Sequence, residues 1–137
     1  MSALTLTAAQ AIIAGALADA RAQELKPLAV IVLDTGGHPI AFAREDGASF
    51  ARLAIARAKA SGALGMDADT SVLTERARSN PIFFQSVSVA LNGQIAFSPG
   101  GVLIKVDGKI LGAVGISGDT GENDDVAARA GIAAAEL

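Results

Sequence analysis

The fold is decided by the stretch FSPGGVLIKVDGKILGAVGISGDTGENDDVAARAG, which runs from Phe97 to Gly131. Within it, two strand-like apolar runs, Val102–Val106 and Lys109–Ile116, flank the dipeptide Asp107-Gly108. Asp-Gly between two such runs predicts a β-hairpin, because both turn positions need a positive φ. A helix is expected to start near Glu122 and to run to the C-terminus, since acidic residues in its first turn complement the positive end of the helix dipole.

The N-terminal part predicts a helix followed by a second hairpin. Apolar residues recur at helical spacing over Ala9–Ala20, with Thr7 as the expected cap and an end before Pro27. The run LAVIVL, Leu28–Leu33, is rich in β-branched residues and is typical of a strand buried on both faces. After a Gly-rich turn, His38–Arg44 is expected to return beside it as the second strand.

The middle of the chain predicts three more helices and one short strand. The expected segments are an Ala-rich helix over Phe50–Leu64, capped by Ser49 and ended by Gly65, then helices over Thr70–Ala77 and Pro81–Leu91, and a strand over Gln94–Phe97. No strand–helix–strand alternation demands a parallel sheet. The order therefore predicts one α+β domain over residues 1–137, with helices packed against a five-stranded antiparallel sheet.

Composition excludes several classes of function. Cysteine is absent, so disulfides, thiolate metal sites and thiol nucleophiles are excluded. The net charge is −3 and the basic residues are scattered, which argues against a nucleic-acid partner. No apolar run approaches the roughly 20 residues of a membrane span. No basic residue precedes the first apolar stretch, as a signal peptide would require, so a cytoplasmic protein is expected.

Three stretches together resemble a known family. They are VLDTGGHPIAFAREDGA (Val32–Ala48), IARAKA (Ile55–Ala60) and the long motif from Phe97 to Gly131. These look like the GlcG/HbpS-like family, often described as haem-degrading or haem-binding domains, and the chain also resembles the C-terminal domain of PduO-type proteins. The resemblance implies a profilin-like α/β/α fold, a homo-oligomer, and haem or another tetrapyrrole as the first ligand to test.

Few residues in the chain could ligate a haem iron. His38 is the only histidine, and it is either an axial ligand or a solvent-facing side chain at a turn. Met66 could supply a thioether sulfur, although a Met at a helix end is more often packing. Thr120 is an oxygen ligand by resemblance, and helix capping is its alternative role. Cysteine and tyrosine, the other ordinary haem ligands, are absent.

A second group of residues fits a small-carboxylate enzyme, such as an isomerase or hydrolase. Arg44, at a strand end, could hold a carboxylate, or pair with Asp46. Either Lys59 or Asp46 would transfer protons, and the family resemblance favours a functional role for Lys59. If the helix face that carries Lys59 is exposed, the residue is instead a solvated charge. Gly100 and Gly101 would let a ligand approach a strand closely, or form a tight turn. A third hypothesis is a structural or regulatory partner, because Ala-rich helices suit close packing between subunits.

One acidic cluster follows the predicted C-terminal hairpin. Its members are Asp119, Glu122, Asp124 and Asp125. Calcium binding would need the acidic spacing and glycine of an EF-hand loop, and that pattern is missing. The sequence therefore predicts an acid-capped helix start rather than a metal site.

Overall fold

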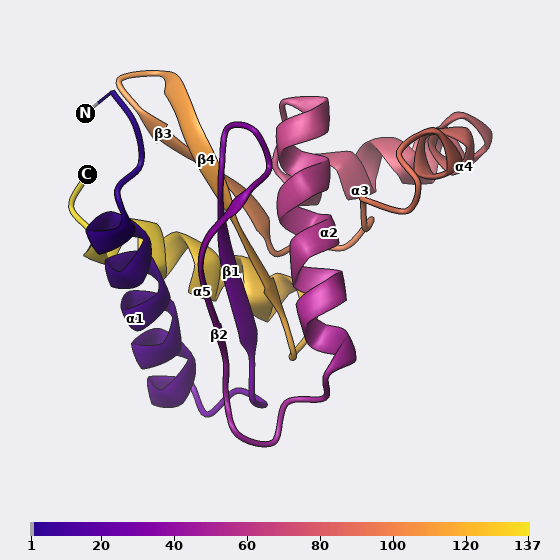
Figure 1. Ribbon diagram of the computed structural model, residues 1–137. Helices are drawn as coiled ribbons and strands as arrows, with labels where there is room; N and C mark the ends of the chain where they lie inside the picture. Colours follow the sequence, from indigo (N-terminus) through magenta and orange to yellow (C-terminus); the bar gives the residue numbers. More distant parts are fainter. Residues whose placement is uncertain (1) are drawn as a thin grey trace.

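The computed structural model describes residues 2–137, which form three layers with the sheet in the middle (Figure 1). The elements in chain order are α1 (Leu6–Ala22), β1 (Ala29–Asp34), β2 (Pro39–Arg44), α2 (Ala51–Met66), α3 (Thr70–Ser79), α4 (Pro81–Ala90), β3 (Gly101–Val106), β4 (Lys109–Ser117) and α5 (Gly121–Ala134). The α+β class predicted from the sequence is confirmed: five helices pack on an antiparallel sheet.

The sheet has four strands in the order β2-β1-β4-β3, and every neighbouring pair is antiparallel. The central strands β1 and β4 are buried for most of their length, which explains their continuous apolar sequences. The C-terminal hairpin predicted from Asp107-Gly108 is present, and the two turn residues have φ values of 52° and 78°. The two central strands therefore lie between the two helical layers.

Alternate side chains of the strands serve two separate cores. Helices α1 and α5 cover one face of the sheet, and α2 covers the other face (Figure 1). On the α1–α5 face the buried strand residues are Val30, Val32, Val102, Ile104, Val114 and Ile116. On the α2 face they are Ile31, Leu33, Leu103 and Ala113. Figure 1 shows α3 and α4 extending away from the sheet beside α2.

The prediction of a fifth strand over Gln94–Phe97 is wrong. The segment has no place in the sheet, because Ile95 packs into a third cluster with Leu73 and Phe84 instead of pairing along an edge. A Cβ atom at Gly62 of α2 would lie 2.5 Å from the Ile95 side chain, so this segment is pressed against the helix. Burial of one isoleucine thus overrides the local strand pattern.

Three predicted helix ends also differ from the structure. The N-cap of α1 is Thr5, whose Oγ1 accepts a hydrogen bond from the Ala8 N–H at 3.1 Å, so Thr7 lies inside the helix. No side chain caps α2, contrary to the role expected of Ser49. Gly65 is helical, and α2 ends at Met66 with Asp67 as its C-cap, which has a φ of 52°. None of the helices described in residues 2–137 is long and apolar enough to cross a membrane.

Candidate functional site

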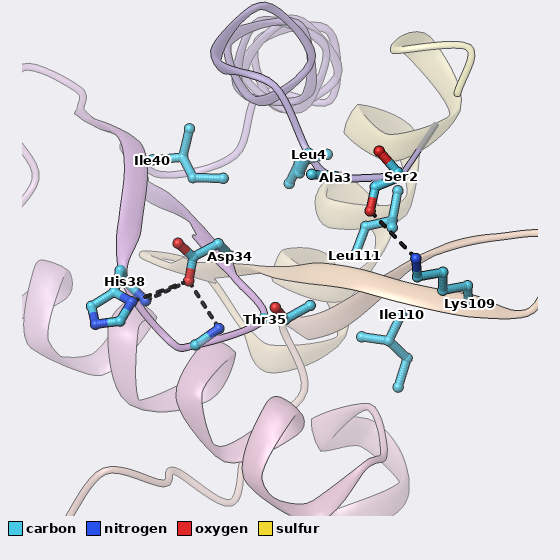
Figure 2. A pocket seen from close by; sticks show the side chains of 11 residues that line it. Ser2, Ala3, Leu4, Asp34, Thr35, His38, Ile40, Lys109, Ile110 and Leu111 are labelled. Atoms are coloured by element: carbon cyan, nitrogen blue, oxygen red, sulfur yellow. Dashed lines mark hydrogen bonds and ion pairs between the residues drawn. The ribbon is translucent and has the colours of Figure 1, made fainter.

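The turn between β1 and β2 holds the single histidine in a defined position. Asp34 Oδ1 accepts hydrogen bonds from the backbone N–H of Gly36 at 2.9 Å and of His38 at 3.0 Å. The same oxygen lies 3.4 Å from Nδ1 of the His38 imidazole (Figure 2). These bonds fix both the turn and the ring that follows it. The His38 side chain is nevertheless 80% exposed, so its other nitrogen is accessible.

A pocket of about 480 Å³ lies beside this histidine. That volume is within the range of ligand pockets, about 300–1,000 Å³. The walls come from the segment before α1, from the β1–β2 turn and from β4, as Figure 2 shows. The lining is apolar at Leu4, Ile40, Ile110 and Leu111, and polar at Ser2 and Lys109. The Lys109 ammonium donates to the Ser2 carbonyl at 3.4 Å.

Electrostatics favour one tautomer of the imidazole. Hydrogen bonds, first of all from the His38 backbone N–H, hold the pKa of the Asp34 carboxyl below its usual value. The carboxylate is therefore ionised at neutral pH and favours a proton on His38 Nδ1. This leaves the Nε2 lone pair free, as in metal-binding histidines whose other nitrogen donates to a carboxylate. The pocket thus combines an accessible imidazole with a lining that is partly polar and partly apolar.

Lys59 does not line this pocket, because it forms a buried ion pair. Its Nζ donates to Asp124 Oδ2 at 3.1 Å and to the Ile116 carbonyl at 2.8 Å. Asp124 Oδ1 also accepts from the Asp119 N–H at 3.0 Å. Burial lowers the pKa of Lys59 and raises the pKa of Asp124, while the attraction between the two charges opposes both shifts. The partner that a buried Lys59 requires is therefore Asp124, and the pair joins α2 to α5.

Gly100 and Gly101 are explained by this ion pair. A Cβ atom at Gly100 would lie 2.9 Å from Lys59 Nζ and 2.8 Å from the Ile116 carbonyl oxygen. At Gly101 it would lie 2.4 Å from the Lys59 carbonyl oxygen. The φ of Gly100 is 127°, which also favours glycine. At both positions the absence of a side chain leaves room for other atoms of the protein itself.

Arg44 and Asp46 lie at a different place on the surface. Together with Arg21, Pro27 and Glu45 they line an open hollow of about 400 Å³. Arg21 is paired with Glu45 at 3.0 Å, whereas Arg44 makes no ion pair with any residue in the described range 2–137. The structure does not bring Arg44 and Lys59 to one cavity.

Thr120 and Met66 have structural contacts. Thr120 Oγ1 accepts from the Asn123 N–H at 3.2 Å and caps α5, and Met66 packs against the cluster formed by Leu73, Phe84 and Ile95. Neither residue lines the His38 pocket.

The three aspartates of the acidic cluster at the start of α5 form hydrogen bonds or ion pairs within the protein. Asp119 accepts from the Asn123 side chain and from the Lys26 and Thr120 backbones, which lowers its pKa to about 2. Asp125 pairs with Arg129 at 2.8 Å. Within residues 2–137, no group of three or more His, Asp or Glu side chains is placed to hold a metal ion.

Sequence reasoning singled out His38 but missed the residues that surround it. The sequence places Asp34 at the start of the Gly-rich turn, four positions before His38, but only the structure shows that the two side chains are in contact. Leu4 and Lys109 come from distant parts of the chain, and only the fold brings them to the pocket. Asp124, the partner of Lys59, was likewise assigned only to the start of a helix.

The fold and the pocket define an α+β domain with a ligand-sized cavity at the rim of its sheet and one accessible imidazole. The model of the haem-degrading protein HbpS-like family matches residues 4–133, and the chain belongs to this family. A comparison with curated protein sequences finds no significant match.

Solved structures support the same assignment. The ORFY protein of Klebsiella pneumoniae has the same fold, with a TM-score of 0.90, 24% identity, and coverage of 100% of this chain and 93% of that chain. A double mutant of Streptomyces reticuli HbpS matches with a TM-score of 0.82 and 28% identity. The match covers 97% of this chain and 87% of that chain. The structure of a PduOC–heme complex matches with a TM-score of 0.87 and 26% identity. The match covers 96% of this chain and 94% of that chain.

Proposed function

We propose that this protein binds haem in the pocket beside His38, with His38 Nε2 as the axial ligand. The observation that carries the proposal is the geometry of the turn, in which Asp34 Oδ1 lies 3.4 Å from Nδ1 of an exposed imidazole and accepts from the His38 backbone N–H. Members of the family bind haem, and the heme complex of PduOC is one solved example. When bound, haem supplies a redox-active iron.

The remaining residues of the pocket have distinct tasks. Leu4, Ile40, Ile110 and Leu111 offer apolar surface to a porphyrin ring and exclude water from it. Asp34 orients the imidazole, as carboxylates beside metal-ligating histidines do. Since Met66 and Thr120 are engaged elsewhere, His38 is proposed as the only side-chain ligand of the iron.

A titration with haemin tests this proposal. Wild-type protein is expected to shift the Soret band at micromolar concentration with one haem per chain, whereas His38→Ala loses at least tenfold in affinity and recovers the shift when imidazole is added. Asp34→Asn keeps the ligand and weakens binding by about 10-fold, as loss of an outer hydrogen-bond partner does. Arg44→Ala serves as the control and is expected to bind normally.

Two results would contradict the proposal. A wild-type titration without a Soret change, while albumin responds normally, removes haem as the ligand. Normal binding by His38→Ala moves the ligand to another site.

We propose as a second candidate an enzyme acting on a small carboxylate at the Arg44 hollow. The favouring observation is that Arg44 is exposed, has no ion-pair partner in the described chain, and lies beside Asp46. Lys59 cannot serve there because it is buried with Asp124, so Asp46 is the residue left to move a proton. A panel of small acids, read by thermal shift and then by turnover, tests it; unchanged results for Arg44→Ala would refute it.

A homo-oligomer is the third part of the proposal. We propose that it forms through α4, because only Phe84 of that helix is buried, while Ile82, Phe83 and Val89 are exposed. Such an apolar surface fits the structural-partner hypothesis as well as an oligomeric haem protein.

A further inference from the structure

Helix α2 carries three cations and no acidic residue. Two of the cations have partners: Lys59 pairs with Asp124, and Arg52 donates to the Ser117 hydroxyl at 3.2 Å. The third, Arg57, is exposed and forms no ion pair with any residue in the described chain. Because α2 holds no carboxylate, its own helix offers nothing to neutralise this guanidinium.

Arg57 lines a hollow of about 450 Å³ that is distinct from the His38 pocket. The hollow contains the hydroxyls of Thr35 and Ser61 and the amide of Gln94, and no acidic residue lines it. A guanidinium surrounded by neutral hydrogen-bonding groups is suited to a carboxylate, which it can bind through two parallel N–H donors. The charge and the chemistry of the lining therefore both point to an anionic group.

Gly65 also lines this hollow, near the C-terminal end of α2. It lies within α2, where glycine destabilises a helix by about 1 kcal/mol relative to alanine. Its backbone is not left-handed, and a Cβ atom there would meet no other atom within 4 Å. Neither a turn nor close packing requires glycine at this position.

The Arg57 hollow and the His38 pocket lie on two sides of one turn. Thr35 and Gly36 line both of them, and a Cβ atom at Gly36 would lie 2.9 Å from His38 Nδ1. We infer that Arg57 binds a carboxylate of the ligand whose iron is held by His38. The inference rests on the proposed function, since haem carries two carboxylates at one edge of its ring. Lys109, the cation of the His38 pocket, is already engaged by the Ser2 carbonyl.

Haemin and its dimethyl ester, which lacks free carboxylates, separate this role from a general effect on the fold. The proteins are wild type, Arg57→Gln, Lys109→Gln as the test of the rival cation, and Arg76→Gln as the matched control, because Arg76 is exposed and lines neither hollow. All are titrated by Soret absorbance. Arg57→Gln is expected to weaken haemin binding by about 10-fold, which corresponds to the loss of one charge-assisted hydrogen bond. The same substitution leaves ester binding unchanged, and wild type binds the ester about 10-fold more weakly than haemin.

The outcomes distinguish this inference from the proposed function. If wild type binds haemin and ester equally, or if Arg57→Gln weakens both equally, the assignment of Arg57 is wrong while haem binding at His38 stands. If Lys109→Gln shows the ester-dependent loss instead, the carboxylate lies in the His38 pocket. If wild type binds neither compound, the proposed function fails and the inference fails with it.

Discussion

The ion pair between Lys59 and Asp124 joins two helices from opposite faces of the sheet. Both side chains are almost completely buried, at 3% and 1% exposure. Removing two charges from water is costly, and good geometry with additional hydrogen bonds has to offset that cost. The Ile116 carbonyl and the Asp119 N–H supply those bonds. The pair therefore holds α2 and α5 in one arrangement around the end of β4, and it lines neither the His38 pocket nor the hollows beside Arg57 and Arg44.

Breaking this pair from one side is expected to destabilise the protein strongly. Lys59→Met leaves a buried carboxylate without a counter-charge, which typically costs about 3–5 kcal/mol of unfolding free energy. The double variant Lys59→Met/Asp124→Leu is expected to lose clearly less than the sum of the two single variants. Urea denaturation measures both quantities. Arg57→Gln on the same helix is the control and is expected to stay within about 0.5 kcal/mol of wild type; an equally mild Lys59→Met would show that the pair is not structural.

The elements of the fold were readable from the sequence wherever local and tertiary signals agree. The hairpin at Asp107-Gly108 and the buried strand β1 were predicted because turn chemistry and continuous apolar runs appear in the sequence itself. The cap at Thr5 and the loss of the strand at Gln94–Phe97 were not predictable in this way. Thr5 and Thr7 carry the same hydroxyl, and only the path of the chain decides which one caps the helix. Likewise, only the packed fold shows that Ile95 is buried.

The residues of the candidate site also differ in whether the local sequence or only the folded chain reveals them. His38 was identifiable because it is the only histidine, and Lys59 because the resemblance to the family favours a lysine at this point. Their roles depend on Asp34 and Asp124, and Asp124 lies far from Lys59 in sequence. Arg57 gave no sequence signal, since an exposed arginine on a helix is ordinary until its surroundings are known.

Alanine substitutions at Gly115 of β4 and Gly65 of α2 are expected to change the stability of the protein in opposite directions. At Gly115 of β4 a Cβ atom would lie 2.0 Å from the Ala56 carbonyl oxygen, so Gly115→Ala forces the helix and sheet apart. Overpacking of this kind costs about 1–3 kcal/mol. Gly65→Ala meets open space and is expected to raise the unfolding free energy by about 0.5–1 kcal/mol, because alanine favours the helix. Thermal or urea unfolding of both variants shows whether the free energy of unfolding falls for Gly115→Ala and rises for Gly65→Ala. A destabilised Gly65→Ala would contradict open space at that position.

The whole molecule distributes its charges unevenly. No charged residue lies between Arg78 and Lys105, a segment that includes all of α4 and the loop before β3. Ile82 and Val89 of this segment are 83% and 77% exposed. Beside them is a hollow of about 310 Å³ lined by α4 and by Phe97. Protein interfaces are depleted of charge and enriched in aromatic residues at their centre, which matches this surface.

A second copy of this chain is the partner that this α4 surface fits best. In a two-fold interface the same patch meets itself, so an uncharged patch meets its copy without repulsion between like charges. The patch also offers both a protruding apolar side chain, Ile82, and a hollow of suitable character. The chain as a whole has a net charge of −3, and an uncharged area removes the main electrostatic obstacle to self-association.

For the homo-oligomer proposed through α4, Ile82→Arg is expected to give a monomer. The substitution places a charge at the centre of an apolar contact, and burying it without a partner is costly. Light scattering at about micromolar concentration should show a mass that is a multiple of the 13.7 kDa chain for wild type and a single chain for the variant. Phe50→Arg is the matched control, because Phe50 is 84% exposed and lies at the start of α2, outside the surface. A monomeric wild type, or dissociation by Phe50→Arg with Ile82→Arg still associated, would show that α4 is not the interface, because the mass of the assembly depends directly on whether this surface is covered.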